Sequence, residues 1–167
     1  MRAEAVPADA STLIYLAKAD AFAEIEHCVP VIAVPPAVWR EAVVDGERIG
    51  APEVPRIVAA PVLRQVELTL AEQSIAESIA TEHRLGQGES EVLALGLDVG
   101  RAIVDEGRAS RVATTLGLVP VSTLFLPILG HRAGMLRVAE AIDLLRRLAV
   151  VTSASADAVF AIEESLK

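Results

Sequence analysis

The sequence predicts an α/β protein with three layers, in which a mostly parallel central sheet lies between two layers of helices. Short runs rich in β-branched residues alternate with longer segments of helical pattern, which is typical of parallel strands joined by helices. Hydrophobic residues make up 53% of the 167-residue chain but aromatic residues only 3%. The core must therefore consist mainly of Ala, Val, Leu and Ile, which suits helices packed on a buried sheet.

The first half of the chain contains turn-forming and helix-capping residues at regular intervals. Asp20 is expected to N-cap a helix, and Pro36 suits a first helical turn because its missing N–H would be unpaired there. Pro7 interrupts a weak first strand, whereas Gly46 and Gly50 are expected to break the chain. In order, the pattern predicts a strand at 4–8, helices at 11–19 and 20–27, a strand at 31–34, helices at 36–45 and 53–59, and an edge strand at 62–68.

The second half alternates in the same way. Thr69 can cap a long helix, the LGQG segment at 85–88 is expected to break the chain, and Pro127 predicts a kink or a delayed helix start. In order, the pattern predicts helices at 69–83 and 89–97, a strand at 101–104, a helix at 106–116, a strand at 119–121, and helices at 123–133, 137–148 and 156–166.

The length, composition and N-terminal sequence favour one cytoplasmic domain. A chain of 167 residues suffices for one domain with a core of its own, and we expect this core at about 5–148. The sequence leaves open whether the helical segment at 150–167 belongs to the core or to a partner interface. No long apolar run predicts a membrane span or a signal peptide. The single cysteine, Cys28, excludes an intramolecular disulfide and is expected to be a buried or half-buried thiol.

Four acidic residues are expected near one edge of the sheet. Functional groups of open α/β sheets gather outside the carboxyl ends of the strands. Asp9 follows the first strand and Asp105 follows the strand at 101–104, while Glu41 and Glu89 lie in helices next to Pro or Gly breaks. Carboxylate oxygens are ligands that Mg²⁺ prefers, and a pair of ions about 3.5–4 Å apart can activate water for phosphodiester hydrolysis.

Each of these acids also has a purely structural interpretation. Asp9 and Asp105 stand where helix N-caps are expected, and Glu41 can be a solvated surface residue. Glu89 and Glu91 can be charges that the helix dipole favours in a first turn. No single residue decides between the two interpretations, so the prediction of a site depends on the joint pattern of acids, strand ends and breaks.

Four segments of the chain resemble PIN domains. In order and spacing these are DASTLIYLAKAD, VPPAVWREAV, LGQGESEVLALGL and AIVDEGRASRVATTLGLVPVST. They are most similar to the compact prokaryotic branch related to VapC-like toxins, over roughly residues 5–148. The resemblance implies a parallel sheet flanked by helices, with three or four acids that bind Mg²⁺ or Mn²⁺ and cleave single-stranded RNA. It also implies a homodimer and, by analogy, an antitoxin protein as partner.

The resemblance assigns roles to individual residues. The catalytic acids and metal ligands would be Asp9, Glu41, Glu89 and Asp105; Ser11, Thr123 and Glu91 would support them; and Arg108 and Arg111 would bind RNA. In this hypothesis Ser11 orients Asp9, Glu91 is a substitute or extra ligand, and the two arginines share a helix face from which they meet phosphates. The expected reaction is in-line attack of a metal-activated water on a phosphodiester, leaving a 5′-phosphate.

The chain departs from the family pattern at two positions and in its charge. Ser122 stands where relatives have glycine before the threonine, so its side chain is expected to crowd the site. Pro7 stands where relatives have β-branched residues, which a first or edge strand tolerates. The net charge of −8 is opposite in sign to that of most nucleic-acid binders. Two bound Mg²⁺ ions would halve it, and an acidic toxin could pair with a basic antitoxin segment.

Four other classes of protein are alternatives to an active PIN nuclease. An inactive PIN-like binding or regulatory module would keep the acids without turnover, and Ser122 favours this alternative somewhat. A phosphatase of the haloacid-dehalogenase type needs a second aspartate two residues after Asp9, where Ser11 stands. A dinucleotide-binding module needs a G-x-G-x-x-G segment after a strand, which the sequence lacks. A purely helical interaction protein would lack the strands at 31–34 and 101–104.

Overall fold

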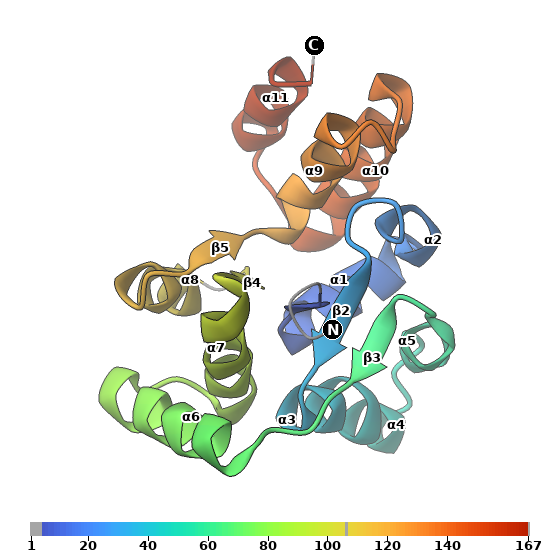
Figure 1. The fold of residues 1–167 in the computed structure, drawn as a ribbon. Coiled ribbons are helices and arrows are strands. Elements are labelled where there is room, and N and C mark those ends of the chain that lie inside the picture. The colour runs from blue at the N-terminus through green and yellow to red at the C-terminus, as the bar shows by residue number, and fades with distance from the viewer. Residues whose placement is uncertain (1–4, 106, 167) are drawn as a thin grey trace.

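A computed structural model describes residues 5–105 and 107–166 and has the predicted α/β architecture (Figure 1). Its strands are β1 Ala5–Pro7, β2 Val31–Val34, β3 Leu63–Gln65, β4 Arg101–Ile103 and β5 Val119–Val121. Strands β1, β2 and β3 form one parallel sheet, and β4 and β5 form a second parallel pair. A parallel bridge between Ala8 and Ile103 joins the two sheets. The strand order is therefore β3-β2-β1-β4-β5, which confirms the mostly parallel sheet.

Pro7 limits the pairing between β1 and β4. The N–H of Ala8 donates to the carbonyl of Ala33 in β2, and the N–H of Asp9 donates to the carbonyl of Ile103 in β4, both at 3.2 Å. Backbone groups alternate sides along a strand, so position 7 faces β4 as position 9 does. Proline has no N–H to donate, so position 7 cannot donate a backbone hydrogen bond to β4. The backbone hydrogen bonding between β1 and β4 therefore begins after Pro7, at Asp9.

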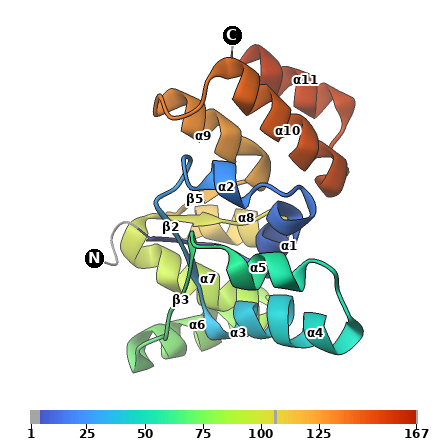
Figure 2. The same cartoon turned by 90° about the vertical axis from the view of Figure 1, so that its right-hand side faces the viewer.

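The helices surround the sheet and are joined to it by short connections (Figures 1 and 2). Helix α7 packs against β1 and β4, and α6 packs against α7 at the periphery of the molecule. In chain order the helical elements are α1 Ala10–Lys18, α2 Phe22–Ile25, α3 Pro36–Trp39, the π-helical turn η2 Arg40–Asp45, α4 Gly46–Ile49, α5 Val54–Ala59, α6 Leu70–His83, α7 Gln87–Val99, α8 Gly107–Thr115, the 3-10 turn η3 Thr123–Phe125, α9 Leu126–Arg132, α10 Val138–Thr152 and α11 Ala156–Glu164.

Two local predictions from the first half of the chain were wrong. Asp20 does not cap α2; it adopts a left-handed conformation with φ of 51°, and Ala21 is the N-cap. Gly46 does not break the chain but lies inside a continuous helix that ends at Gly50, where φ is 70°. A Cβ atom at position 46 would lie 2.7 Å from Cγ2 of Val54. The glycine therefore allows close packing between α4 and α5.

The LGQG segment is also only partly a break. Helix α7 begins at Gln87, with Gly86 as its N-cap. A Cβ atom at Gly88 would lie 3.4 Å from both Cγ2 of Val38 and Oε2 of Glu41. Gly88 is therefore a site of close approach between α7 and the helix that starts at α3. The delayed start predicted from Pro127 is confirmed, because η3 precedes α9 and the proline lies in the first turn of α9.

The core consists mainly of aliphatic side chains, as the composition predicts. The C-terminal helices share this core: Leu144, Leu145 and Leu148 are fully buried, and Ile162 and Leu166 are 7% and 2% exposed. The segment after residue 150 thus packs on the rest of the domain. In Figures 1 and 2, α9, α10 and α11 form a helical unit at one end of the molecule. Across the described residues, the helices are too short or too polar to cross a bilayer.

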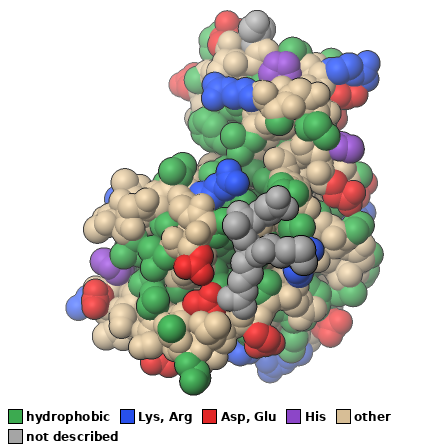
Figure 3. Space-filling view, viewed as in Figure 1, with side chains coloured by type: hydrophobic (Ala, Val, Ile, Leu, Met, Phe, Trp, Pro, Cys, Tyr) green, Lys and Arg blue, Asp and Glu red, His purple; other side chains and the backbone are tan. Residues whose placement is uncertain are grey.

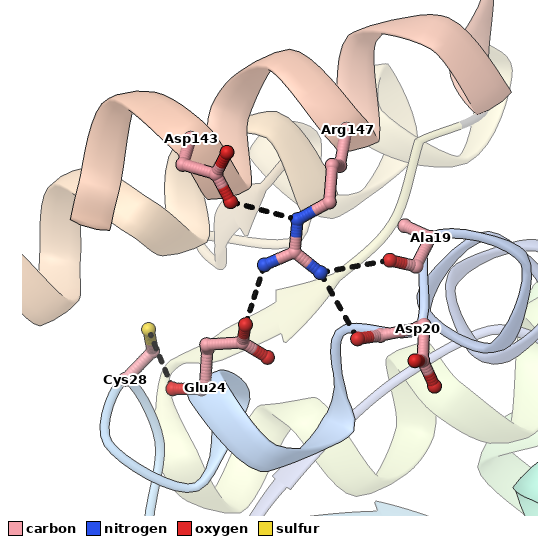
Figure 4. A network of polar contacts seen from close by, with 6 residues as sticks. All are labelled: Ala19, Asp20, Glu24, Cys28, Asp143 and Arg147. Atoms are coloured by element: carbon pink, nitrogen blue, oxygen red, sulfur yellow. Dashed lines mark hydrogen bonds and ion pairs between the residues drawn. The ribbon is translucent and has the colours of Figure 1, made fainter. Parts of the chain in front are cut away.

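Arg147 holds this helical unit against the first helices (Figure 4). Its guanidinium donates to the backbone carbonyls of Ala19 and Asp20 at 2.9 and 3.0 Å, and to the carboxylates of Asp143 and Glu24. The two carbonyls lie between α1 and α2. The left-handed turn at Asp20 is a local end of α1, in which the N–H of Ala21 donates to the carbonyl of Leu16 at 2.9 Å. Near this network Cys28 is half-buried, as expected, and its Sγ lies 3.5 Å from the Glu24 carbonyl.

Candidate active site

Asp9 and Asp105 lie side by side because the strands that precede them are neighbours. Asp9 follows β1 and is the N-cap of α1; Oδ1 accepts from the N–H of Thr12 at 2.8 Å and from Thr12 Oγ1 at 2.7 Å. Asp105 follows β4, and its backbone N–H donates to Asp9 Oδ2 at 3.4 Å. The Asp9 side chain is 4% exposed. The bridge between Ala8 and Ile103 therefore brings two carboxylates to one point at the carboxyl edge of the sheet.

The residues after β5 hold the carboxylate of Asp105. Its Oδ1 accepts from Ser122 Oγ at 2.7 Å and from the N–H of Thr123 at 2.8 Å. Its Oδ2 accepts a short hydrogen bond from Thr123 Oγ1 and lies 3.5 Å from Thr12 Oγ1. Thr123 is fully buried. The end of β5 thus fixes the orientation of an acid that follows β4.

Two threonine hydroxyls connect the two acids. Thr12 Oγ1 and Thr123 Oγ1 lie 3.2 Å apart. Each hydroxyl has one proton to donate, and the shortest contacts direct one proton to Asp9 and the other to Asp105. Oδ2 of Asp9 accepts only the long contact from the Asp105 N–H, so it is the carboxylate oxygen with the most remaining capacity to bind a cation.

Burial changes the acidity of Asp9. The pKa of the Asp9 carboxyl rises from 3.8 to about 6, mainly because burial removes it from water; hydrogen bonds from Thr12 lower it, and the nearby charge of Asp105 adds to the rise. The Asp9 side chain is therefore a carboxylate near neutral pH at a cost in free energy. A bound cation would offset this cost, because opposite charge favours the ionised form.

Glu41 and Glu89 form a second carboxylate pair. Glu41 lies in η2, and π-helical turns are frequent at functional sites. Partial burial raises the pKa of the surface residue Glu41, and the charges of Glu89 and Asp45 raise it further. Glu89 caps its own helix, because its Oε2 accepts from the N–H of Gly86 at 2.9 Å. The Glu41 carboxylate lies against Gly88, in the first turn of α7.

The four predicted acids thus form two pairs. Among residues 5–105 and 107–166, no three His, Cys, Asp or Glu side chains gather closely enough to hold one metal ion together. Asp9 with Asp105 forms the pair at the strand ends, and Glu41 with Glu89 forms the pair at the start of α7. The expectation that all four converge at a single point is therefore not met by this structure.

Glu91 and Ser11 lie differently from the expectation. Glu91 is 7% exposed; its Oε2 accepts from the N–H of Ala37 at 2.8 Å and its Oε1 from Nε2 of Gln87 at 3.0 Å. One oxygen thus caps the N-terminus of α3 and the other accepts from Gln87, so both carboxylate oxygens are satisfied. The hydroxyl that contacts Asp9 belongs to Thr12, one residue after Ser11. The spacing Asp-x-x-Thr at the start of α1 is the signal in the sequence that could have identified Thr12.

The two predicted basic residues have different surroundings. Arg108 is exposed, but its Nη1 donates to the carbonyl of Arg84 at 3.2 Å and so ties α8 to the end of α6. Arg111 is exposed, and its Nη1 lies 3.5 Å from the position that a Cβ atom on Gly107 would occupy. Within the described part of the chain, Arg111 has no ion pair and no side-chain hydrogen bond. Of the two, Arg111 is the more available to a ligand.

Ser122 does not crowd the acids, contrary to the expectation. Its Oγ donates to Asp105 and accepts from the N–H of Leu124 at 3.3 Å, which caps η3. The serine therefore adds a hydrogen bond to Asp105, and it occupies part of the acceptor capacity of Oδ1. Glycine at this position would leave that capacity free.

Comparison with known families agrees with this geometry. The family model DUF3368, described as a PIN domain, matches residues 5–157, which is nearly the whole chain. The chain belongs to the PIN domain family. PIN domains are generally nucleases that use divalent metal ions, and the resemblance found in the four sequence segments is thereby confirmed. No curated protein and no solved structure matches the chain significantly.

Proposed function

We propose that this PIN domain is a metal-dependent endoribonuclease that cleaves single-stranded RNA. The observation that carries the proposal is the pairing of Asp9 with Asp105 at the ends of adjacent strands, inside one network of hydrogen bonds from Thr12, Thr123 and Ser122. Such an arrangement holds two carboxylates in place before substrate arrives, and preorganised charged groups are the largest contribution to many enzymatic rate enhancements.

The donor set suits a divalent cation such as Mg²⁺ or Mn²⁺. Mg²⁺ is usually bound by one or two carboxylates and keeps several waters, and Asp9 and Asp105 would supply two. The raised pKa of the buried Asp9 reflects negative charge that a cation would stabilise. When bound, the metal would supply Lewis-acid stabilisation of the phosphate and a more acidic water.

The protein side chains would position the acids and manage protons. Thr12 and Thr123 hold the carboxylates of Asp9 and Asp105 in fixed rotamers, so little reorganisation is needed when substrate binds. Glu41 and Glu89 are a second pair of carboxylates near the start of α7. In this proposal they bind water or a second cation next to the RNA rather than completing the ligand set of the first pair.

The charge of the protein is compatible with an RNA substrate only if cations contribute to binding. The net charge is −8, and on the face shown in Figure 3 the Lys and Arg side chains are scattered rather than gathered. RNA binding should therefore depend on divalent metal and on a few arginines, with Arg111 the more available of the two candidates. We further propose, from the resemblance alone, that the protein is a dimeric toxin neutralised by a basic antitoxin segment.

Cleavage of single-stranded RNA tests the enzymatic proposal. Wild type should cleave in Mg²⁺ or Mn²⁺, lose activity with a chelator and recover it when metal returns. Asp9→Asn and Asp105→Asn should lose at least ~100-fold in kcat, since each removes one of the two carboxylates proposed to hold the metal. Glu91→Gln is the matched control, because the Glu91 oxygens accept hydrogen bonds from the N–H of Ala37 and from Gln87. Equal cleavage by wild type and both aspartate variants would refute the proposal.

A second candidate function is a catalytically inactive PIN module that binds metal or RNA without turnover. Two observations favour it: the acids form two separate pairs, and Ser122 Oγ occupies Oδ1 of Asp105. Ser122→Gly distinguishes the two functions. If the module is inactive because of this serine, the variant should gain cleavage that wild type lacks. If the protein is an active nuclease, the variant should change the rate only modestly.

A further inference from the structure

An apolar groove lies beside the paired acids. It has a volume of about 400 Å³ and shares Asp105 and Ser122 with the candidate active site. The other walls come from the start of α8, from β5, and from the turn between β5 and α9. Lining residues on these walls include Gly107, Val119, Pro120, Phe125 and Leu129. The groove is therefore lined by Asp105 and Ser122 on the side of the paired acids and mainly by apolar residues elsewhere.

Phe125 lines this groove with half of its surface exposed. It is one of three phenylalanines in the chain. Phe22 is packed in the core at 8% exposed, whereas Phe125 is 50% exposed, next to Val119 at 62%. A large aromatic side chain on the surface contributes little to stability, since much of its apolar area stays in water. Phe125 and Val119 are exposed together along one groove, and adjoining exposed apolar side chains are typical of binding sites.

The position of Phe125 is fixed relative to the acids. It ends η3, and Thr123 at the start of the same turn donates both its N–H and its hydroxyl to Asp105. The N–H of Phe125 donates to the carbonyl of Ser122 at 2.9 Å. Pro127, in the first turn of α9, further restricts the backbone that follows. The ring is thus carried by the turn that also holds the proposed metal ligand.

The chemistry of the groove matches one nucleotide better than an apolar peptide. A nucleobase has flat faces that stack on aromatic rings and an edge of hydrogen-bonding groups. The groove offers the aromatic ring of Phe125, the apolar ring of Pro120 and the polar side chains of Ser110 and Asp105. Arg111 adds positive charge at the rim, because its guanidinium lies against Gly107, a lining residue. Phosphate carries the complementary negative charge.

We propose that this groove binds one nucleobase of the RNA, stacked on Phe125, next to the phosphodiester positioned at Asp105. The subsite rests on the proposed ribonuclease function and adds to it a means of substrate positioning. Since every base has a π-face, stacking tolerates all four bases. Purines, with the larger face, should be preferred over pyrimidines at this one position of the RNA.

Substitution of Phe125 tests the subsite. Stacking of one base contributes roughly 10- to 100-fold in affinity, so Phe125→Leu should raise KM by about that factor, with a smaller change in kcat. Phe125→Tyr should restore most of the loss, because it restores an aromatic ring. Phe160→Leu is the matched control: Phe160 is an exposed phenylalanine of α11, 64% exposed. Circular dichroism and thermal melts should show the same fold for all variants.

An RNA that lacks one base at a time locates the contact. In wild type, removal of the base at one position next to the scissile phosphate should weaken binding, whereas in Phe125→Leu the same removal should have no further effect. If wild type cleaves RNA and Phe125→Leu keeps its KM within about twofold, the subsite is wrong and the nuclease stands. If wild type neither binds nor cleaves RNA, both proposals are overturned. If Phe125→Leu changes only self-association in sedimentation, the groove belongs to an interface between copies and the subsite is wrong.

Discussion

Replacing Asp9 with asparagine should stabilise the metal-free protein near neutral pH while it removes the charge proposed to bind metal. Asp9 is 4% exposed, and burial is the main reason that its pKa rises from 3.8 to about 6. Asparagine keeps an oxygen that can accept from Thr12, and it is as good an N-cap as aspartate. The substitution therefore removes a buried negative charge with little change in shape.

The size and the pH dependence of this effect follow from the pKa. A shift from 3.8 to about 6 corresponds to about 3 kcal/mol, at 1.36 kcal/mol per pH unit. Because the pKa of Asp9 is raised in the folded state, protonation favours folding: the stabilisation is complete below the unfolded pKa and is lost as pH rises through about 6. The asparagine variant loses nothing over this range. Its advantage over wild type should grow from near zero at about pH 4 to about 3 kcal/mol above about pH 7.

Urea denaturation in the presence of a chelator, at several pH values, measures this difference. The matching change in melting temperature is roughly 6–12 °C for a domain of this size. Asp157→Asn is the control, since Asp157 is an exposed aspartate of α11. Saturating Mg²⁺ should stabilise wild type but not Asp9→Asn. A variant no more stable than wild type at about pH 8, or a difference that does not change with pH, would refute the reasoning.

Three further predictions concern residues around the acids and the C-terminal helices. Thr12→Val removes a hydroxyl that donates to Asp9, so the acid limb of the pH–rate profile should move up by about one unit; an unchanged profile would contradict the role of Thr12. Glu91→Gln weakens the cap on α3, so the free energy of unfolding in urea should fall by about 1 kcal/mol while Mn²⁺ binding stays the same. Weaker Mn²⁺ binding would show that Glu91 is a ligand. Arg147→Met removes four hydrogen bonds from a side chain that is 31% exposed, so the free energy of unfolding should fall by roughly 2 kcal/mol. Cleavage per folded molecule should stay the same. A loss of activity in fully folded protein would contradict a purely structural role.

The sequence predicts those parts of the fold that depend on local interactions. The strand at 31–34 has the predicted bounds. Thr69 makes both hydrogen bonds of its capping box with Glu72. In each case the signal is local: a β-branched run marks the strand, and two residues three positions apart mark the cap.

The sequence fails where a distant neighbour decides the local structure. Gly46 and Gly88 have the appearance of helix breaks, but each allows close packing against a side chain of another element, Val54 and Val38. Asp20 is a separate case: it has the appearance of an N-cap for α2, but it takes the left-handed position that ends α1, where the N–H of Ala21 donates to the carbonyl of Leu16. Glycine has several structural uses, and at Gly46 and Gly88 the tertiary contacts select one of them.

The candidate site shows the same division. Asp9 and Asp105 could be placed together because they follow strands of one parallel sheet. Glu91 could not be separated from Glu89 by spacing, since its partner is the N–H of Ala37, 54 residues away. The family resemblance predicts Ser11, not Thr12, as the hydroxyl partner of Asp9. The geometry of the helix start favours the residue three positions after Asp9.

Calorimetric titration of Mn²⁺ into the metal-free protein tests most directly whether the Asp9–Asp105 pair is a metal site. Wild type should bind Mn²⁺ at millimolar concentration or tighter, and binding near pH 6 should release protons because the pKa of Asp9 is about 6. The double variant Asp9→Asn/Asp105→Asn should bind no metal and should cleave no RNA on the same samples. Metal binding that is equal in wild type and the double variant, or absent from both, would contradict the account.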